Sequence, residues 1–285
     1  NFQPILAAFD IKNKEENRFL IDVSNHYMND SPGFNIIRKT QKENYKIGSA
    51  DKKRSLIDAA KSFPKNTEIL HTLTFSASKA PRANPSKTFS FQINHSFIAL
   101  PEDQMKIRYS DRRVGWFSLK KIDYSSQALK ADEIELIRRW RLEPKDEEAY
   151  ERGELSEPIK PIVYYLDPAT PTKWRPYFKQ GIEDWNTAFE KAGFKNAIQA
   201  KEPPTAEEDP DFSPEDIRYS TVRYVASTTR NAVGPSVSDP RTGEIIESDI
   251  IWYHNHLRSY RNRYLLETAA ANPKARTLDT PEKEI

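Results

Sequence analysis

The chain has 285 residues and a formal net charge of +2, from 44 lysines and arginines against 42 aspartates and glutamates. Because the two signs are interspersed along the sequence, we expect no nucleic-acid partner. The absence of cysteine excludes disulfides, thiolate catalysis and cysteine-bound metals. No apolar run approaches the roughly 18 residues that a membrane span requires. A chain of this length is expected to form two domains.

The first 145 residues have the pattern of a β-rich domain. Alternating apolar residues predict a β-hairpin over residues 1–28, and a polar stretch predicts a loop over residues 29–50. Residues 51–63 place their apolar side chains on one helical face, and Pro64, which directly follows, would end a helix. That segment is therefore predicted to be a short helix.

The rest of this domain is predicted to consist of paired strands. Strands are expected around residues 68–76 and 89–100, joined into a long hairpin by a loop rich in proline, serine and lysine. Residues 100–124 predict two strands around a charged turn at residues 111–113. Residues 133–142 carry apolar side chains at every second position, which is typical of a strand.

A charged segment with few apolar residues, 146–157, predicts a linker. After it, residues 162–166 predict a strand, and an amphipathic helix follows with Thr172 as its N-cap and Gly193 at its end. One apolar stripe runs along this helix at spacings of four, four, three and four: Trp174, Phe178, Ile182, Trp185 and Phe189. Aromatic residues at this spacing indicate core packing rather than a ligand cage.

Short strands and one helix complete the pattern. Strands are expected over residues 217–225, 232–238 and 245–253, and a polar, arginine-rich helix over residues 257–271. The sequence Asp-Pro-Arg-Thr-Gly at residues 239–243 closes a hairpin between two of these strands. Taken together, the elements predict an α+β protein.

Three stretches carry a family resemblance: LPEDQMKIRYSDRRVGWF at residues 100–117, the helix over residues 174–194, and DPRTGEI at residues 239–245. In these, the chain resembles secreted bacterial zinc-dependent metalloproteases of the zincin type, which carry a domain of unknown function ahead of the protease. The resemblance implies an accessory or pro-like domain over residues 1–145. It further implies the N-terminal half of a zincin-like catalytic domain over residues 158–285, with a mixed twisted sheet and a long backing helix. Localisation would be secreted or periplasmic.

The chemistry that the resemblance implies is hydrolysis of a peptide bond by a zinc-activated water, with a glutamate as base. In such enzymes the next element is a helix with H-E-x-x-H, which this chain lacks. We therefore expect no catalytic residue and no bound zinc in this chain. The implied partners are a peptide or protein substrate and the C-terminal half of the catalytic domain. That half would cover the sheet face opposite the backing helix, and the face left open would promote association.

Two other functions remain open at this point. One is a non-catalytic binding or scaffold module with a degenerate zincin-like half. The other is an inhibitory or folding pro-region. Reading the gene beyond Ile285 would distinguish them from a protease, because a protease requires H-E-x-x-H shortly downstream.

Five residues are candidates for substrate binding: Ala232, Val233, Gly234, Pro235 and Ser236. Small residues with glycine and proline suit the edge of a sheet rather than its centre. In the resembled fold such an edge pairs with extended substrate backbone. The alternative is a plain hairpin.

Two further features are candidates for binding a metal ion. Asp111 is a candidate latency switch, since a pro-segment carboxylate holds the zinc in some zinc proteases; the alternative is a solvated turn or a salt bridge. His254 and His256 would point to one face of a strand. No third ligand accompanies them, so surface histidines are the favoured interpretation.

Overall fold

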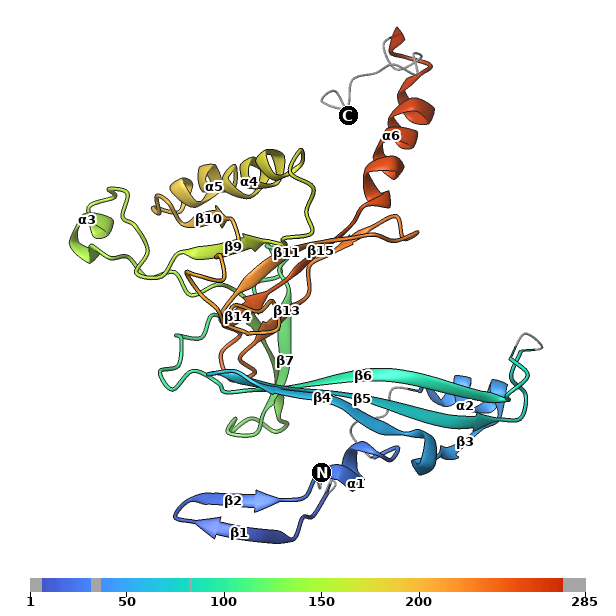
Figure 1. The fold of residues 1–285 in the computed structure, drawn as a ribbon. Helices are drawn as coiled ribbons and strands as arrows, with labels where there is room; N and C mark the ends of the chain where they lie inside the picture. The colour runs from blue at the N-terminus through green and yellow to red at the C-terminus, as the bar shows by residue number, and fades with distance from the viewer. Residues whose placement is uncertain (1–6, 32–36, 82–83, 274–285) are drawn as a thin grey trace. The chain divides into compact units, whose positions relative to one another are not determined.

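The computed structural model describes residues 7–31, 37–81 and 84–273. The chain divides into two compact units, Asn1–Ala99 and Leu100–Ile285, and Figure 1 shows that sheets make up most of the fold. Helices and strands occur in both units, so the predicted α+β class is confirmed. Each unit is described separately.

The first unit is built around β5 (Asn66–Ala77), the central strand of an antiparallel sheet (Figure 1). Along one side it pairs with β4 (Leu56–Ser62) and β3 (Ile47–Ala50). Along the other side β6 (Thr88–Ile98) pairs with it over its whole length, from Asn66↔Ile98 to Ser76↔Thr88. The predicted long hairpin is thus confirmed.

Two predictions for the first unit are wrong. Residues 51–63 form a short 3₁₀ turn, η1 (Lys52–Arg54), and then β4, because the backbone pairs with β5 instead of closing helical turns. Residues 29–50 are not all loop: they contain α2 (Lys39–Tyr45) and β3. In both segments the strand is formed by pairing with β5.

A hairpin is present in the predicted N-terminal segment, but it is shorter than predicted: β1 (Ile11–Glu15) pairs with β2 (Arg18–Ile21), and residues 7–10 are not part of a strand. Residues 1–6 of the prediction lie outside the described residues. A short helix, α1 (Ser24–Tyr27), follows and buries Tyr27. Apolar side chains from the sheet and its flanks form the core of the unit: Ile37, Leu73, Phe75 and Ile93.

The second unit begins with irregular chain and a two-stranded sheet, β7 (Ser118–Asp123) with β8 (Asp132–Ile137). The first strand predicted within residues 100–124 is absent; a single bridge, Tyr109↔Leu136, stands in its place. The strand predicted over residues 133–142 ends at Ile137. Beyond it, Trp140 and Leu142 pack against the core of the main sheet.

Residues 146–157, for which the sequence predicts a linker, contain a helix, α3 (Glu147–Glu151). The Asp146 side chain caps it by accepting a hydrogen bond from the backbone N–H of Ala149 at 3.0 Å. The Tyr150 ring packs on Phe194, with centroids 5.1 Å apart, so this segment is folded onto the rest of the second unit.

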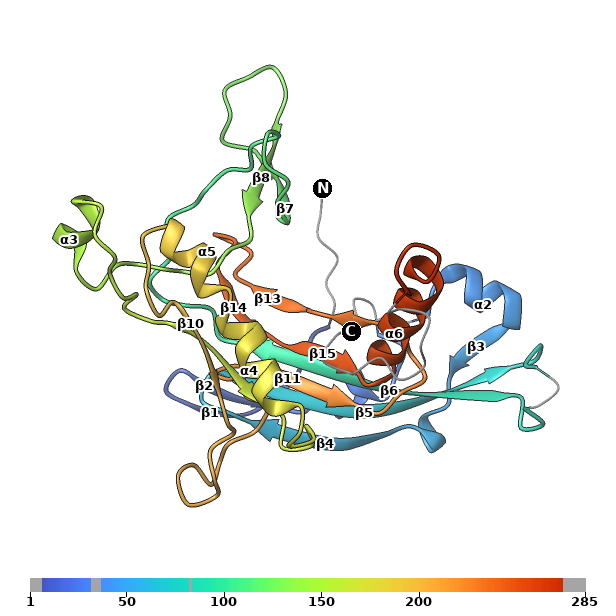
Figure 2. The same cartoon turned by 90° about the horizontal axis from the view of Figure 1, so that it is seen from above.

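The main sheet of the second unit has four parallel strands and one antiparallel edge strand. Figures 1 and 2 show α4 (Arg175–Glu183) and α5 (Asn186–Lys191) lying over one face of it. In spatial order the strands are β10 (Ile198–Lys201), β9 (Ile162–Leu166), β11 (Ser220–Val225), β15 (Ile250–Tyr253) and β12 (Ala232–Val233).

The core lies between this sheet and the helices. Its buried members are Ile162, Tyr164, Leu166, Ile182, Ile198 and Val222, with Phe178 and Phe189 packed against them. The single predicted helix is broken into α4 and α5 around Asp184 and Trp185, and Trp185 is 63% exposed. Assigning Trp185 to the core was therefore wrong. The N-cap is Trp174 rather than Thr172, whereas Gly193 ends the helical segment as predicted, with φ +92°.

Because of the break between α4 and α5, Ile182 and Trp185 are expected to contribute differently to stability. Replacing the buried Ile182 by alanine is expected to lower the free energy of unfolding by about 2–4 kcal/mol, because it leaves a cavity in the core. Replacing Trp185 by alanine is expected to change it by no more than about 0.5 kcal/mol, as at other exposed positions. Urea unfolding of both variants checks this; equal losses would place Trp185 in the core after all.

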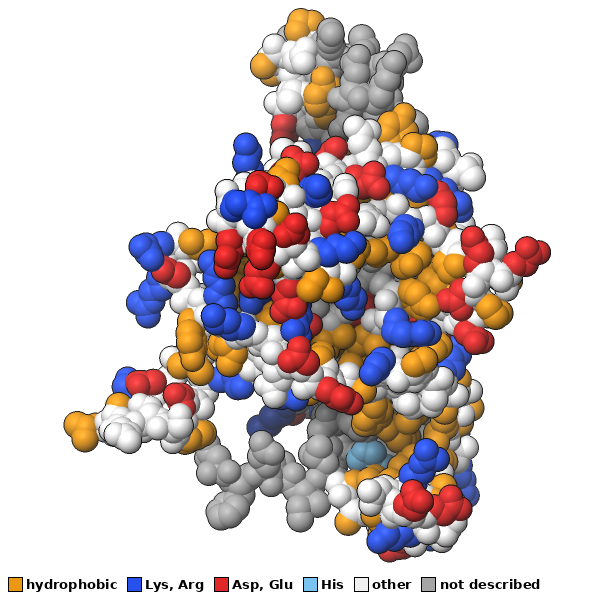
Figure 3. Space-filling view, turned by 90° about the vertical axis from the view of Figure 1, so that its left-hand side faces the viewer, with side chains coloured by type: hydrophobic (Ala, Val, Ile, Leu, Met, Phe, Trp, Pro, Cys, Tyr) orange, Lys and Arg blue, Asp and Glu red, His pale blue; other side chains and the backbone are white. Residues whose placement is uncertain are grey.

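The last elements are a hairpin and a helix. β13 (Ser236–Ser238) pairs with β14 (Ile245–Ser248), and the predicted turn at residues 239–243 joins them. α6 (Asn255–Thr268) follows β15, close to the predicted helix. Within the described ranges, no helix is long and apolar enough to cross a membrane. Figure 3 shows basic and acidic side chains interspersed over one face of the molecule.

Candidate functional site

The predicted substrate-binding segment begins at the edge of the main sheet. Ala232 and Val233 form β12, which pairs with β15 through Ala232↔Trp252 and Val233↔Ile251. β12 is the last strand in the sheet order, and Val233 is exposed. An edge strand presents unpaired backbone groups along its outer side, to which an extended chain can add.

The other three predicted residues lie past this edge. Gly234 and Pro235 interrupt the strand, since proline lacks the N–H that a ladder requires. The Pro235 carbonyl accepts a hydrogen bond from Ser248 Oγ at 3.0 Å. Ser236 begins β13, and its hydroxyl and carbonyl both accept from the guanidinium of Arg138. The predicted strand over residues 232–238 is therefore two strands, of which only β12 belongs to the main sheet.

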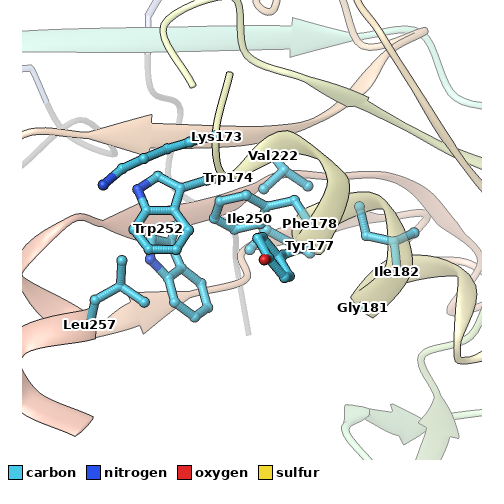
Figure 4. Close-up of a pocket in the computed structure, with 10 residues that line it drawn as sticks. All are labelled: Lys173, Trp174, Tyr177, Phe178, Gly181, Ile182, Val222, Ile250, Trp252 and Leu257. Carbon is cyan, nitrogen blue, oxygen red and sulfur yellow. The ribbon is translucent and has the colours of Figure 1, made fainter. Parts of the chain in front are cut away.

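An apolar groove lies beside this sheet edge, on the face that carries α4. Figure 4 shows side chains from α4, β11, β15 and the start of α6 converging on it. Its volume is about 620 Å³, and the Phe178 ring meets the Trp252 ring edge-on at 5.4 Å. The lining residues include Trp174, Phe178, Ile182, Val222, Ile250 and Trp252.

A second hollow continues the groove along α6 and has a basic rim. It shares Trp174, Trp252 and Leu257 with the first and adds Arg258 and Arg261. Its volume is about 630 Å³. The combined surface is thus aromatic and apolar on its floor and cationic at one end.

The opposite face of the sheet is covered near β9. Tyr165, which alternates with the core residue Tyr164, contacts Phe212 and Tyr219 with ring centroids 5.6 and 5.5 Å apart. The groove itself lies on the α4 side of the sheet, whereas the sequence led us to expect an open surface on the opposite side.

His254 and His256 do not stand on a strand, because β15 ends at Tyr253 and α6 begins at Asn255. His254 Nδ1 accepts a hydrogen bond from the backbone N–H of Ser227 at 2.9 Å. The His256 ring packs between other aromatic rings, 4.9 Å from Trp252 and 4.5 Å from Tyr260. Among the residues that the structure describes, no three histidine or acidic side chains are grouped to hold a metal ion.

Asp111 lies in a tight local turn. Its carboxylate accepts from the backbone N–H of Arg113 at 2.9 Å and from the Arg113 guanidinium at 2.6 Å. These hydrogen bonds lower the pKa of the Asp111 carboxyl below its ordinary value. The same Asp-x-Arg geometry recurs at Asp216 and Asp239, whose side chains are fully buried. The arrangement thus favours the structural interpretation of Asp111.

A pair of carboxyl groups that the sequence did not single out is formed by Glu247 on β14 and Asp249, which lies between β14 and β15. Burial, and then the charge of Asp249, raise the pKa of Glu247 to about 8, so its carboxyl group holds a proton at neutral pH. Asp249 Oδ1 accepts from the backbone N–H and the hydroxyl of Thr221, at 2.9 and 2.6 Å. The only sequence signal is two acids at i and i+2 after an apolar run, which is too common to be specific.

Comparisons with known proteins identify one region. Residues 1–145 match the family model described as Domain of unknown function (DUF5117). No curated protein and no solved structure gives a significant match.

Proposed function

The chain belongs to the family of the domain of unknown function DUF5117, and from this premise and the fold of its second unit we propose that it is the N-terminal portion of a zinc-dependent metallopeptidase. Residues 1–145 would serve as its accessory or pro-like domain, and residues 158–285 as the first half of its catalytic domain. The intact enzyme would hydrolyse peptide bonds in a peptide or protein substrate outside the cytoplasm.

The observation that carries the proposal is the order of the main sheet. Four strands are parallel, and the only antiparallel one in that sheet, β12, stands at the edge. In zincin-type proteases an edge strand of this kind pairs with extended substrate. Ala232 and Val233 would supply the pairing backbone, while Gly234 and Pro235 end the strand.

The apolar groove supports the same proposal. It lies on the α4 side, over Val222, Ile250 and Trp252, where a further helix could bury its apolar face. The occupant we propose is the helix bearing H-E-x-x-H, which follows this part of the fold in the resembled proteases. Covering such a surface contributes about 25 cal/mol per Å² of apolar area.

The residues present do not fit a zinc site. His254 and His256 are held by Ser227 and by aromatic rings, and the described part of the chain offers no group of three ligands. Zinc ligands and the general base would therefore come from polypeptide outside this sequence, and this chain would contribute the substrate edge and the scaffold.

Peptidase activity is expected to require the sequence that follows Ile285 in the gene. The test compares this chain with one extended through the downstream coding sequence, on a fluorogenic peptide with and without a metal chelator. We expect turnover only from the extended chain and its loss with the chelator. An extended chain that folds, lacks H-E-x-x-H and cleaves nothing would instead support a binding module.

A further inference from the structure

Two histidines face each other inside the first unit. His71 on β5 and His95 on β6 have their Nε2 atoms 2.9 Å apart and their rings stacked, with centroids 4.9 Å apart. His71 is only 1% exposed. At this distance one Nε2–H donates to the lone pair of the other Nε2, so at least one ring must be neutral.

Helix α1 rests on this pair. The buried Tyr27 ring lies 5.4 Å from His71 and 5.6 Å from His95, measured between centroids. The titratable groups that face the pair are Asp58 on β4, and His26 and Tyr27 on α1. Burial is the main cause that lowers the pKa of both His71 and His95. On His71 a hydrogen bond with the Tyr27 backbone and the charge of Asp58 act in the opposite direction, and the charge of His26 lowers the pKa further. On His95 the charges of His71 and His26 lower the pKa further.

We propose that the His71–His95 pair is an acid-sensitive latch that holds α1 against the sheet of the first unit. When both rings are protonated, each Nε2 is a donor and neither can accept. Two positive charges would then face each other in a site with little access to water. The rings separate, and Tyr27 loses the surface on which it packs.

The direction of the pH dependence follows from linkage. Because the closed state lowers both pKa values, it is fully stable above the ordinary histidine pKa of about 6.5 and loses stability as the pH falls below it. For each proton that only the open state binds, the closed state weakens about tenfold per pH unit. This device lies in the first unit and does not depend on the proposed peptidase.

Hydrogen exchange of the full chain tests the latch. Peptides that cover α1 are followed at pH 7.5 and pH 5.0, with rates corrected for intrinsic exchange and with EDTA present so that a bound metal cannot mimic the effect. We expect roughly a tenfold or greater loss of protection in α1 at pH 5.0, while peptides from β9 in the second unit keep theirs. Equal protection of α1 at both pH values would overturn the proposal.

Substitutions of histidine distinguish a pH-sensitive latch from a purely structural role of the His71–His95 pair. His95→Gln supplies an amide that can bond to His71 without titrating, so α1 should stay protected at pH 7.5 and lose most of its pH dependence. His254→Gln, in the second unit, should keep the wild-type profile. A His95→Gln chain that retains the wild-type profile would contradict the proposal.

A second measurement covers the case in which the His95→Gln chain fails to fold. Proton NMR of histidine Cε1–H in the wild-type chain should show two signals, those of His71 and His95, with midpoints below the ordinary histidine value of about 6.5. If neither signal has a lowered midpoint, the latch does not exist.

Discussion

Replacing Gly243 by valine is expected to lower the free energy of unfolding of the second unit by about 3–5 kcal/mol. Gly243 has φ +81°, which a β-branched residue tolerates poorly, and a Cβ at this position would lie 2.3 Å from the backbone oxygen of Ile137. That oxygen cannot move aside cheaply, because the turn is fixed by backbone hydrogen bonds from Arg139 N–H to the Gly243 carbonyl and from Ile245 N–H to the Arg139 carbonyl. The loss is a large part of the 5–15 kcal/mol that stabilises an ordinary domain.

Tryptophan fluorescence during denaturant unfolding measures this loss, because all five tryptophans lie beyond residue 99, in the second unit. Gly181→Ala is the matched control. No atom outside its own helix lies within 4 Å of the added Cβ, and alanine should stabilise α4 by about 0.5–1 kcal/mol. If Gly243→Val were as stable as the parent, the close contact with Ile137 would not exist.

The second unit is also expected to lose stability as the pH rises from about 6 to about 8. Glu247 has its pKa raised to about 8 by burial and by the charge of Asp249. The unfolded chain releases this proton near the ordinary glutamate value, whereas the folded chain keeps it. The stabilisation is therefore fully present below the unfolded pKa and is lost as the pH rises through the folded one. Because Glu247 is only partly buried, we discount the effect for solvent screening to about 1–2 kcal/mol.

The measurement is the melting temperature by tryptophan fluorescence at pH 6, 7, 8 and 9. Glu247→Gln cannot ionise, so its melting temperature should stay nearly constant over this range. The surface variant Glu154→Gln, which keeps the carboxyl pair, should fall with pH like the parent. A parent chain with a flat profile would show that Glu247 is already ionised at pH 6.

Local patterns in the sequence were sufficient for several elements. β9 occupies residues 162–166 as expected from its apolar run, and Gly193 ends the helical segment because it tolerates the left-handed conformation. The β5–β6 hairpin follows from two alternating runs around a loop. In each case neighbouring residues determine the conformation.

Other elements depart from the pattern of their own residues. Residues 51–63 have a helical apolar pattern, yet they pair with β5 and become a strand. Trp185 fits the helical stripe, but the break between α4 and α5 turns it outward. No pattern in residues 232–238 shows that only Ala232 and Val233 join the main sheet.

The candidate site divides in the same way. The sequence by itself determined that residues 232–236 suit a sheet edge, because small residues with glycine and proline disfavour a central strand. Only the tertiary structure decided that β12 is antiparallel at the edge, that the groove lies on the α4 side, and that burial raises the pKa of Glu247. Strand order, burial and shifted pKa values arise from contacts between distant segments, and these contacts leave no periodic signal in the chain.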